Sequence, residues 1–485
     1  MNTAPISRRH ALGLLGAGVA TVAAGAAGWV RGAGGHSGVT GAELAEPATL
    51  TSAGGLLDVR LTAAPGVRLA GRATSAWGYN GTSPGPTLHV RPGDLLRIHL
   101  VNHLPQATNL HTHGLHVSPQ GAGDNPFVTV EPGGRFDYAI RIPADHPAGT
   151  FWYHPHHHGQ VADQIFAGLA GALIVDGGPD LAVRADRVLL VTDTTLDAAG
   201  DVTGQAATPM GREGDLVLVN GHDRPVVTAG AGTTERWRVI NGCTSRVLAL
   251  RLTGHLLTQL AGDGVFLPSA VDRERIVLAP GNRADLLVRP AGPGAWPLIA
   301  EPYDRGSAMM GGMGAGGPAS ATAALVLATL KVGGTGPAAT TALPPLPTPA
   351  VPAGAVTVRR RLTLAMAMGM GMGNNAMSFT IDGRTFDADR DDQTVALGSV
   401  EEWTVDNTTT MDHPFHLHAW PFQVVATSAG DAPGPVRQDV VLVPAGGWAR
   451  LRIAFTDFTG RSVYHCHILD HEDRGMMGVV NVGIP

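Results

Sequence analysis

The chain has 485 residues, which at a usual domain size of about 100–200 residues predicts two to four domains. Its formal net charge of -6 argues against nucleic acid as a partner. Only 15% of the residues are charged, and the 66 Gly and 35 Pro indicate many turns between short strands rather than long helices.

The N-terminus carries the pattern of an export signal. Arg8 and Arg9 precede an uncharged apolar run that extends to about Val30. This arrangement resembles a twin-arginine signal peptide, with small residues at 24–27 as a cleavage site. The alternative is a permanent membrane anchor, but the run is rich in Ala and Gly rather than in Leu and Ile. We therefore predict a signal peptide and linker at residues 1–45, and a periplasmic or secreted protein without a stable membrane anchor.

One sequence pattern occurs three times in the rest of the chain. A Gly is followed nine residues later by an Asn in three places: Gly93 and Asn102, Gly232 and Asn241, and Gly398 and Asn407. A turn signal stands upstream of each pair, at Asn80-Gly81, Asn220-Gly221 and Asp382-Gly383. The repeat predicts three units, at residues 46–178, 179–335 and 356–485. The Pro-rich stretch 336–355 predicts a semi-rigid linker between the second and third units.

Alternation of apolar and polar residues within the repeat predicts strands. Leu96, Ile98 and Leu100 alternate with polar residues and are flanked by turn signals. Such segments are typical of antiparallel strands in a Greek-key barrel or sandwich. We therefore predict an all-β chain of three Greek-key β-barrel or sandwich domains.

Pairs of the form His-x-His follow the repeat in the first and last units. Counting nine and eleven residues on from the repeat Asn gives His111 and His113 in the first unit, His416 and His418 in the last, and Leu250 and Leu252 in the middle. Five and seven residues beyond a later Gly, at 149, 460 and 294, stand His154 and His156, His465 and His467, and Ile299 and Glu301. Each outer unit therefore carries two His pairs, and the middle unit carries none.

The four pairs together supply eight imidazoles. A mononuclear metal site takes three or four ligands, so eight suit three coppers better than one or two. In a chain with 21 His, a single pair arises easily by chance, but four pairs in repeat register do not. We therefore expect the first and third units to face each other, with a copper cluster at their interface.

A second metal site is predicted around Cys466. On an extended strand alternate side chains face opposite ways, so Cys466 points away from His465 and His467. His471 and Met476 follow Cys466 at spacings of five. One further His would complete the two-His, one-Cys site with a weak axial Met that describes blue copper. The alternative is a chance cluster in a His-rich chain.

The first unit lacks this second site, because Pro155 and Leu169 stand opposite Cys466 and Met476 in the repeat. The other cysteine, Cys243, has no His or Met at ligand spacing and is interpreted as a small buried hydrophobe. With Cys466 assigned to copper, no disulfide is expected, although the chain is predicted to be exported.

These motifs resemble those of the multicopper oxidases, the three-domain family of laccases, cuprous oxidases and bilirubin oxidases. The resemblance rests on residues 80–86, 111–114, 152–156, 413–418 and 465–476, and it covers nearly all of the mature chain. It implies three cupredoxin-like domains. It also implies four copper ions: a type 1 copper on His413, Cys466, His471 and axial Met476, a type 2 copper on His111 and His416, and a type 3 pair on His113, His154, His156, His418, His465 and His467.

The resemblance further implies an oxidase that couples one-electron oxidation of phenolic or similar donors to four-electron reduction of O2 to water. Most donors give one electron at a time, and four coppers can store all four electrons before partial products escape. The type 1 site would collect electrons near the surface, and the short path from Cys466 to His465 and His467 would deliver them inward. An axial Met should hold the type 1 potential moderate.

Protons must also reach the oxygen, and the family uses acidic residues near the cluster. Asp124 and Glu472 resemble these residues. Asp124 is alternatively a turn residue in Gly-Ala-Gly-Asp-Asn-Pro, and its loop departs from some relatives by about two residues. Glu472 is alternatively a solvated carboxylate. His157 and His158 extend a ligand motif and are interpreted as outer or surface groups.

Two Met-rich stretches bear on the reducing substrate. Met366, Met368, Met370 and Met372 alternate with Ala and Gly, and Met309, Met310 and Met313 lie in a Gly-rich loop. Soft thioethers favour Cu(I), and the resemblance implies cuprous oxidase activity, because exposed Met arrays near the type 1 copper of some relatives are associated with it; flexible hydrophobic filling is the alternative. A dedicated cuprous oxidase for copper tolerance and a non-catalytic exported copper-binding protein stay open, although the latter has no use for the link from Cys466 to His467. Four His pairs argue against a copper nitrite reductase.

Overall fold

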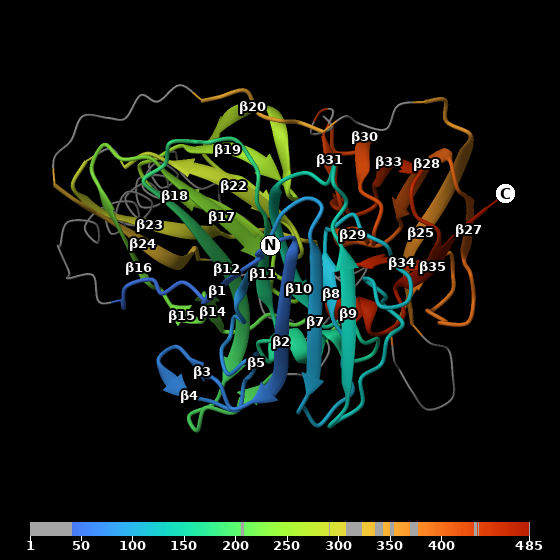
Figure 1. Cartoon of the computed structure of the whole chain (residues 1–485), viewed down its shortest axis with the longest axis horizontal. Helices are drawn as coiled ribbons and strands as arrows, with labels where there is room; N and C mark the ends of the chain where they lie inside the picture. Colours follow the sequence, from blue (N-terminus) through green and yellow to red (C-terminus); the bar gives the residue numbers. More distant parts are fainter. Residues whose placement is uncertain are drawn as a thin grey trace, which may run out of the picture. The chain divides into compact units, whose positions relative to one another are not determined.

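The computed structural model describes residues 41–204, 208–290, 292–306, 323–334, 343–349, 354–368, 377–430, 434 and 436–484. Nearly all of the predicted export signal lies outside these residues, so it stays a prediction. In the described part of the chain, no helix combines the length and apolar character needed to cross a membrane. Figure 1 colours the strands along the chain from blue, through green and yellow, to red.

The first unit contains two main sheets, with strand orders β1-β6-β11-β10-β8 and β5-β2-β7-β9, and a small β3-β4 ribbon. Its elements are β1 (Thr49–Thr51), β2 (Leu56–Pro65), β3 (Arg68–Leu69), β4 (Arg72–Ala73), β5 (Trp77–Tyr79), β6 (Thr87–Val90), β7 (Leu95–Asn102), β8 (His111–His113), β9 (Arg135–Arg141), β10 (Gly149–His154), α2 (Val161–Phe166) and β11 (Gly171–Val175).

The middle unit has sheet orders β15-β14-β12-β17-β22-β19-β20, with β13 beside β12, and β16-β24-β23-β18-β21. Its elements are β12 (Ala185–Leu196), β13 (Val202–Thr203), β14 (Leu216–Val219), β15 (His222–Asp223), β16 (Val226–Gly230), β17 (Glu235–Asn241), β18 (Leu248–Leu252), β19 (Leu257–Gly262), β20 (Val265–Arg273), β21 (Ile276–Leu278), β22 (Arg283–Val288), β23 (Gly294–Glu301) and β24 (Leu325–Gly333).

The third unit has sheet orders β26-β25-β28-β33-β30-β31 and β27-β35-β34-β29-β32. Its elements are β25 (Val358–Met368), β26 (Met377–Ile381), β27 (Gln393–Ala396), β28 (Ser399–Asn407), β29 (His413–Leu417), β30 (Phe422–Thr427), β31 (Arg437–Gln438), β32 (Val440–Val443), β33 (Trp448–Phe455), β34 (Gly460–Cys466), α3 (Leu469–Glu472) and β35 (Met477–Gly483).

The same three-strand pattern recurs in each unit. A central strand lies between a parallel and an antiparallel neighbour: β7 lies between β2 and β9, β17 between β12 and β22, and β28 between β25 and β33. Each central strand ends at the repeat Asn found in the sequence. The threefold sequence repeat is therefore a repeat of strand topology.

The repeat Asn makes the same hydrogen bonds three times. Its buried side-chain amide donates to one backbone carbonyl in the following loop and to another farther along the chain, and its Oδ1 accepts the N–H two residues on. The donor–acceptor pairs are Asn102 with Gln106 and Val130, Asn241 with Arg246 and Leu278, and Asn407 with Met411 and Val443. An amide suits this position because it donates and accepts at once.

The predicted turns adopt the conformation that their sequence favours. Both central residues have positive φ at Asn80-Gly81, Asn220-Gly221 and Asp382-Gly383. Asn, Asp and Gly tolerate this left-handed region best. Each turn thereby fixes the register of the strands that lead to the central strand of its unit.

Each unit packs its own hydrophobic core, with Tyr138 in the first, Trp237 in the middle and Trp403 in the third. The predicted all-β fold of three repeated units is confirmed. The boundaries at 46–178, 179–335 and 356–485 stay predictions. Within the predicted linker 336–355, residues 343–349 form neither helix nor strand, and only 354–355 are described beyond them.

Candidate metal centres

Strand pairing brings the His pairs of each outer unit together. β8 pairs with β10, which places His111 opposite His154. β29 pairs with β34 in the same way, which places His416 opposite His465. The equivalent middle strands β18 and β23 also pair, but Leu250 stands where the outer units have a His. The same backbone therefore presents imidazoles only in the outer units.

Imidazoles of the first and third units meet across the interface between these units. The rings of His111 and His418 stack with their centroids 3.8 Å apart. Nε2 of His156 lies 3.2 Å from Nε2 of His465. These contacts confirm the expectation that the first and third units face each other.

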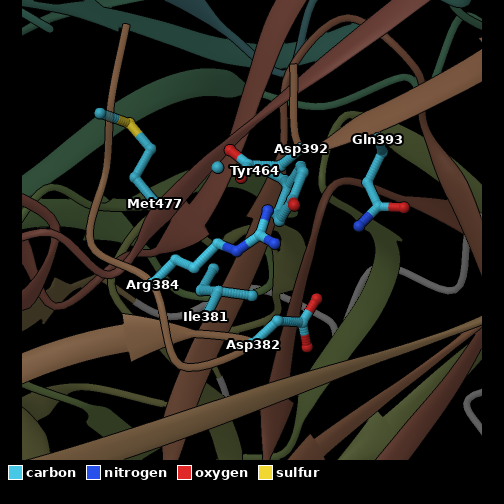
Figure 2. A pocket seen from close by; sticks show the side chains of 8 residues that line it. Ile381, Asp382, Arg384, Asp392, Gln393, Tyr464 and Met477 are labelled. Carbon is cyan, nitrogen blue, oxygen red and sulfur yellow. The ribbon is translucent and has the colours of Figure 1, made fainter. Parts of the chain in front are cut away.

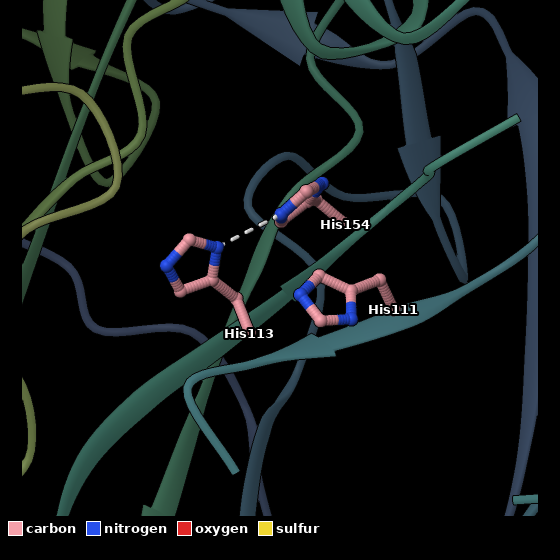
Figure 3. Close-up of side chains that lie close together, drawn as sticks. All are labelled: His111, His113 and His154. Atoms are coloured by element: carbon pink, nitrogen blue, oxygen red, sulfur yellow. Dashed lines mark hydrogen bonds between the residues drawn. The ribbon is translucent and has the colours of Figure 1, made fainter. Parts of the chain in front are cut away.

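Three imidazoles of the first unit converge beside this interface, as Figure 3 shows. Nδ1 of His113 lies 3.3 Å from Nε2 of His154, and His111 lies next to both. One ring nitrogen from each of the three lies within 4.8 Å of the others. The ring of His113 also stacks on that of His416 at 4.0 Å, so this group is continuous with the third unit.

Burial keeps the clustered imidazoles neutral. It lowers the pKa of His154 to about 3 and that of His156 to about 4. Burial also holds the pKa well below its ordinary value at His111, His113, His416, His418 and His467. A neutral imidazole has the free lone pair that binds a metal.

Several nitrogens of the cluster are buried without a hydrogen-bond partner. They include Nε2 of His111, Nε2 of His416 and both ring nitrogens of His467. Buried polar atoms in proteins are normally paired, so this group of unpaired nitrogens fits a cation-binding site. Imidazole donors suit copper, and the residues present therefore fit the metal that the sequence predicts.

The second site lies around Cys466. Sγ of Cys466 lies 3.2 Å from Nδ1 of His413 and 3.8 Å from Nδ1 of His471, and these two nitrogens are 3.4 Å apart. Met476 is fully buried, and its backbone carbonyl accepts the N–H of Cys466 at 3.0 Å. The four residues predicted for a blue copper are thus brought together.

The charges of this second site also fit a metal. Burial raises the pKa of the Cys466 thiol and lowers the pKa of His413 to about 3. A buried thiol forms the thiolate that binds metal only when a cation is close by. Two neutral imidazoles, a cysteine and a methionine form the donor set of a blue copper site.

One stretch of chain joins the two sites. Cys466 contacts the second site, while its neighbours His465 and His467 reach the imidazole cluster. Nε2 of His465 lies 3.1 Å from Nε2 of His418, and the rings of His465 and His467 are 5.6 Å apart. The opposite directions predicted for Cys466 and its neighbours are therefore observed.

Asp124 contacts the imidazole cluster from the first unit. Its Oδ2 lies 2.8 Å from Nδ1 of His111, and its Oδ1 accepts the backbone N–H of Thr112 at 2.8 Å. Burial raises the pKa of Asp124 to about 7. The residue is therefore more than a turn former, because it holds a His of the cluster and can gain or lose a proton near neutral pH.

Glu472 contacts the cluster from the end of α3. Its carboxylate is fully buried, with Oε2 at 2.9 Å from Nδ1 of His465 and Oε1 at 3.3 Å from Nε2 of His156. Burial alone would raise the pKa of Glu472, but its contacts with the imidazoles of His465 and His156 hold that pKa below its ordinary value. Glu472 is thus a buried carboxylate, not a solvated one.

Sequence reasoning missed Arg283 and Asp439, which tie all three units to the cluster. Arg283 is fully buried in the middle unit and donates to both carboxylate oxygens of Asp439, at 2.7 and 2.6 Å. Asp439 in turn accepts from Nε2 of His113 at 3.0 Å, and its carbonyl accepts from Nδ1 of His416 at 2.8 Å. The only sequence signal was a charged residue directly before the apolar strand β32.

The remaining candidates lie outside both sites. His157 lies 3.3 Å from the hydroxyl of Thr129, and His158 packs against Phe386, so neither joins the clustered imidazoles. Cys243 is a buried free cysteine in the middle core, as interpreted from the sequence.

Most of the two Met-rich stretches lies outside the described residues. Met366 is half-buried and packs against the third core. The side chain of Met368 and the whole of Met309, Met310, Met313, Met370 and Met372 lie outside the described residues.

A pocket on the third unit is not a copper site. Figure 2 shows it between β26, the segment before β27, and Tyr464 of β34. Its lining includes Asp382, Arg384 and Asp392 but no His or Cys. Met477 offers the pocket a single thioether, but the imidazole and thiolate ligands of a copper site are absent from its lining.

Comparisons with known proteins agree with the architecture. Domain models described as multicopper oxidase match residues 62–180, 186–325 and 359–485. Multicopper oxidase mco of Staphylococcus haemolyticus is 29% identical over 417 residues, covering 84% of this chain and 83% of the relative. Cell division protein FtsP of Escherichia coli is 29% identical over 366 residues, covering 73% of each chain.

A solved structure gives the same result. The multicopper oxidase from Campylobacter jejuni, described as a metallo-oxidase, has a TM-score of 0.80 and 30% sequence identity, covering 91% of this chain and 95% of that one. The likeness extends over all three repeated units, and it confirms the resemblance drawn from the His and Cys motifs. The chain belongs to the multicopper oxidase family.

Proposed function

We propose that the protein is an oxidase that takes single electrons from phenolic or similar donors and uses them to reduce O2 to water. The observation that carries this proposal is the position of Cys466 between two His of the imidazole cluster, with its sulfur in the second site. A protein that only stored copper would not need a covalent link between a thiolate site and a multi-imidazole site.

The proposed ligands follow the motifs and the observed groups. A type 1 copper would be held by His413, Cys466, His471 and Met476, a type 2 copper by His111 and His416, and a type 3 pair by His113, His154, His156, His418, His465 and His467. Copper, when bound, supplies one-electron redox chemistry at each position. Four such positions match the four electrons that O2 needs to become two waters.

The chain itself supplies the route between the sites. Cys466 is bonded through the backbone to His465 and His467, so an electron collected at the thiolate has two short paths to the cluster. His416 and His113 are fixed by Asp439, and Asp439 is fixed by Arg283. Fixed ligands reduce the reorganisation that accompanies each electron transfer.

Asp124 and Glu472 are proposed to hold and move protons for oxygen reduction. Asp124 lies against His111 with a pKa of about 7, so it can give up and regain a proton near neutral pH. Glu472 lies between His156 and His465 on another side of the cluster. The two carboxyls thus reach the cluster from different units.

Cu(I) oxidation is a second candidate function. Phe379 stacks on the ring of His471 with centroids 4.2 Å apart, and Met366 is the Cα partner of Phe379 in the β25–β26 pair. The Met-rich residues 366–372 therefore begin beside the second site, and thioethers favour Cu(I). The Campylobacter jejuni protein is itself described as a metallo-oxidase.

A test of this second candidate replaces Met366, Met368, Met370 and Met372 with Leu and compares turnover of Cu(I) with turnover of a phenol. Loss of Cu(I) turnover alone supports a cuprous site. Equal loss of both activities, or of neither, contradicts it.

We also propose that the twin-arginine segment within residues 1–45 directs export, and N-terminal sequencing of the exported protein tests the cleavage site near residues 24–27.

A non-catalytic role is the main competitor of the oxidase proposal, since the relative FtsP is named as a cell division protein. The competitor predicts copper binding without turnover.

The decisive test of the oxidase proposal replaces Cys466 with Ser. The copper-loaded protein should be blue and should consume O2 with 2,6-dimethoxyphenol, whereas Cys466→Ser should lose the colour and lower O2 uptake to about one-hundredth or less. Cys243→Ser is the matched control and should keep both properties, because Cys243 lies in the core of the middle unit. O2 uptake that survives in Cys466→Ser would show that the proposed electron path is wrong.

A further inference from the structure

Arg305 of the middle unit is a buried cation between the two loops that carry the ligands of the type 1 candidate site. Its guanidinium donates to the carbonyl of Ser245 at 2.9 Å and to Oε1 of Glu213 at 2.8 Å. The residue itself is buried. An arginine in a protein keeps its proton, so this position carries a fixed positive charge in the interior.

The backbone of Arg305 pairs with the loop that leads into the ligand His413. The carbonyl of Arg305 accepts the N–H of Asp412 at 2.7 Å, and Gly306 forms a β-bridge with Met411. His413 follows Asp412 directly in the sequence. Arg305 is therefore anchored one residue away from a proposed copper ligand.

The segment that holds the guanidinium contacts the other ligand loop. Ser245 adjoins Thr244, and the carbonyl of Thr244 accepts the N–H of Leu469 at 3.0 Å. Leu469 begins α3, the helix that carries His471. Arg305 is thus fixed from both sides, by the loop of His413 through its backbone and by a neighbour of the His471 loop through its side chain.

The charge of Arg305 acts on the ligands of the type 1 candidate site. Burial lowers the pKa of His413 most, and Arg305 lowers that pKa further. Burial raises the pKa of the Cys466 thiol most; Glu472 adds to that rise, and Arg305 acts against it. The effects of Arg305 on both ligands have the sign expected of a nearby positive charge.

Glu213 neutralises Arg305 only in part. Oε2 of Glu213 lies 3.0 Å from Nη1 of Arg246, so two arginines share one carboxylate. The side chain of Glu213 is 18% exposed and that of Arg305 is 8% exposed, so solvent screens the negative charge more than the positive one. A net positive potential therefore remains on the side of Arg305 that faces the ligand loops.

We propose that Arg305 raises the reduction potential of the type 1 copper, an inference that rests on the proposed function. When the donor gives its electron and Cu(II) becomes Cu(I), the site loses one positive charge. A fixed cation nearby disfavours the more positive, oxidised form and so favours reduction. Arg305 thereby increases the driving force for taking an electron from a phenolic donor, although it touches neither the donor nor O2.

The test removes or keeps the positive charge and measures the potential by titrating the blue absorption against the hexacyanoferrate(III)/(II) couple. Arg305→Met removes the cation, so the equilibrium constant for reduction of the type 1 copper should fall roughly tenfold, the order expected for one buried charge at an effective dielectric constant of about 20. Arg305→Lys keeps the charge while losing the planar donor group, and its constant should stay within about threefold of wild type.

A second variant changes the charge with the opposite sign and serves equally if Arg305→Met does not fold. Glu213→Gln removes the negative partner with almost no change in side-chain size, so the equilibrium constant for reduction should rise, by about threefold because this carboxylate is partly screened. Arg224→Met removes an exposed cation paired with Asp223 in the same unit and is the matched control, which should leave the constant unchanged.

Two results would overturn the inference. One is an unchanged or lowered constant in Glu213→Gln, which means that the local charge does not act on the copper. The other is a constant that falls as far in Arg305→Lys as in Arg305→Met, which means that the contacts of Arg305 matter and its charge does not. A wild-type protein that takes up four coppers, is blue and consumes O2 keeps the proposed function intact in either case, whereas a colourless, inactive wild type refutes the proposed function itself.

Discussion

The outer units and the middle unit share one strand skeleton but divide the chemistry between them. Where the third unit places His416 on β29, the middle unit places Leu250 on the equivalent strand β18. The middle unit instead supplies Arg283, which reaches the cluster through Asp439. The difference teaches that the fold repeat is independent of metal binding, and that a unit without proposed ligands can still set the geometry of a metal centre.

Replacing a clustered His of the third unit with the Leu found in the middle unit should have the largest effect, a loss of O2 uptake. His416→Leu removes a proposed type 2 ligand, so O2 uptake should fall about a thousandfold or more, whereas the blue absorption of the Cys466 site should remain. Metal analysis should show less copper per chain. His222→Gln, in the middle unit, is the control and should behave as wild type. If His416→Leu kept its O2 uptake, the proposed difference between the third and middle units would be wrong.

Removing Arg283, the residue that the middle unit contributes next to the cluster, should have the next largest effect, a loss of stability. Arg283→Met leaves the buried carboxylate of Asp439 without its partner, which should lower the free energy of unfolding by about 3–5 kcal/mol. The type 2 electron paramagnetic resonance signal should also shift, because Asp439 fixes His113 and His416. Arg224→Met removes an exposed ion pair and should cost at most about 1 kcal/mol. Equal costs for the two variants would refute the role given to Arg283.

The repeat Asn provides a direct test that the skeleton is shared. Asn102→Ala and Asn241→Ala each remove the same set of hydrogen bonds, one in the first unit and one in the middle unit. Each should lower the free energy of unfolding of the copper-free protein by about 2 kcal/mol, measured by denaturant titration. Losses in the free energy of unfolding that differ by more than about 1 kcal/mol would show that this Asn does not have the same structural role in the two units.

Acid should lower the stability of the copper-free protein through the buried histidines of the outer units, and this effect should be smaller than those of the substitutions. Burial lowers the pKa of His154 to about 3 and of His156 to about 4, so below pH 6.5 the unfolded chain binds protons that the folded chain does not. Stability should therefore fall as pH drops from about 6.5 towards 4, by about 1.4 kcal/mol per pH unit for each proton. Asp124, with its pKa raised to about 7, acts in the opposite direction but is outnumbered by the buried histidines.

This pH effect should be confined to the outer units. In the described residues of the middle unit, neither His222 nor His255 is buried, so hydrogen exchange at pH 5 should lose protection first in the first and third units. Loss of protection that begins in the middle unit would contradict the assignment of the titrating groups.

The clustering of the His and Cys side chains could be predicted because their positions follow a local rule. Counting from the repeat Asn placed His111 and His416, and strand alternation placed Cys466 opposite His465 and His467. Asp124 stayed open between a turn residue and a cluster carboxyl, because its contact with His111 depends on how its loop folds back onto β8. A local sequence pattern carries no record of which distant segments it will contact.

Arg283 and Asp439 could not be predicted for the same reason. They are 156 residues apart in sequence and belong to different units, and each is a single charged residue without a repeating partner. The hydrogen bond between Nε2 of His471 and the carbonyl of Pro209 likewise joins residues 262 positions apart. Such contacts arise only when the units dock, whereas the His pairs are set by the strands that carry them.

We propose that one strand serves both a thiolate copper site and a three-copper cluster between the outer units. Anomalous diffraction from crystals of the copper-loaded protein tests it most directly. Four copper peaks are expected, one beside Cys466 and three among the eight imidazoles of the first and third units. A single peak, or copper bound to the middle unit in place of the cluster, would contradict the account.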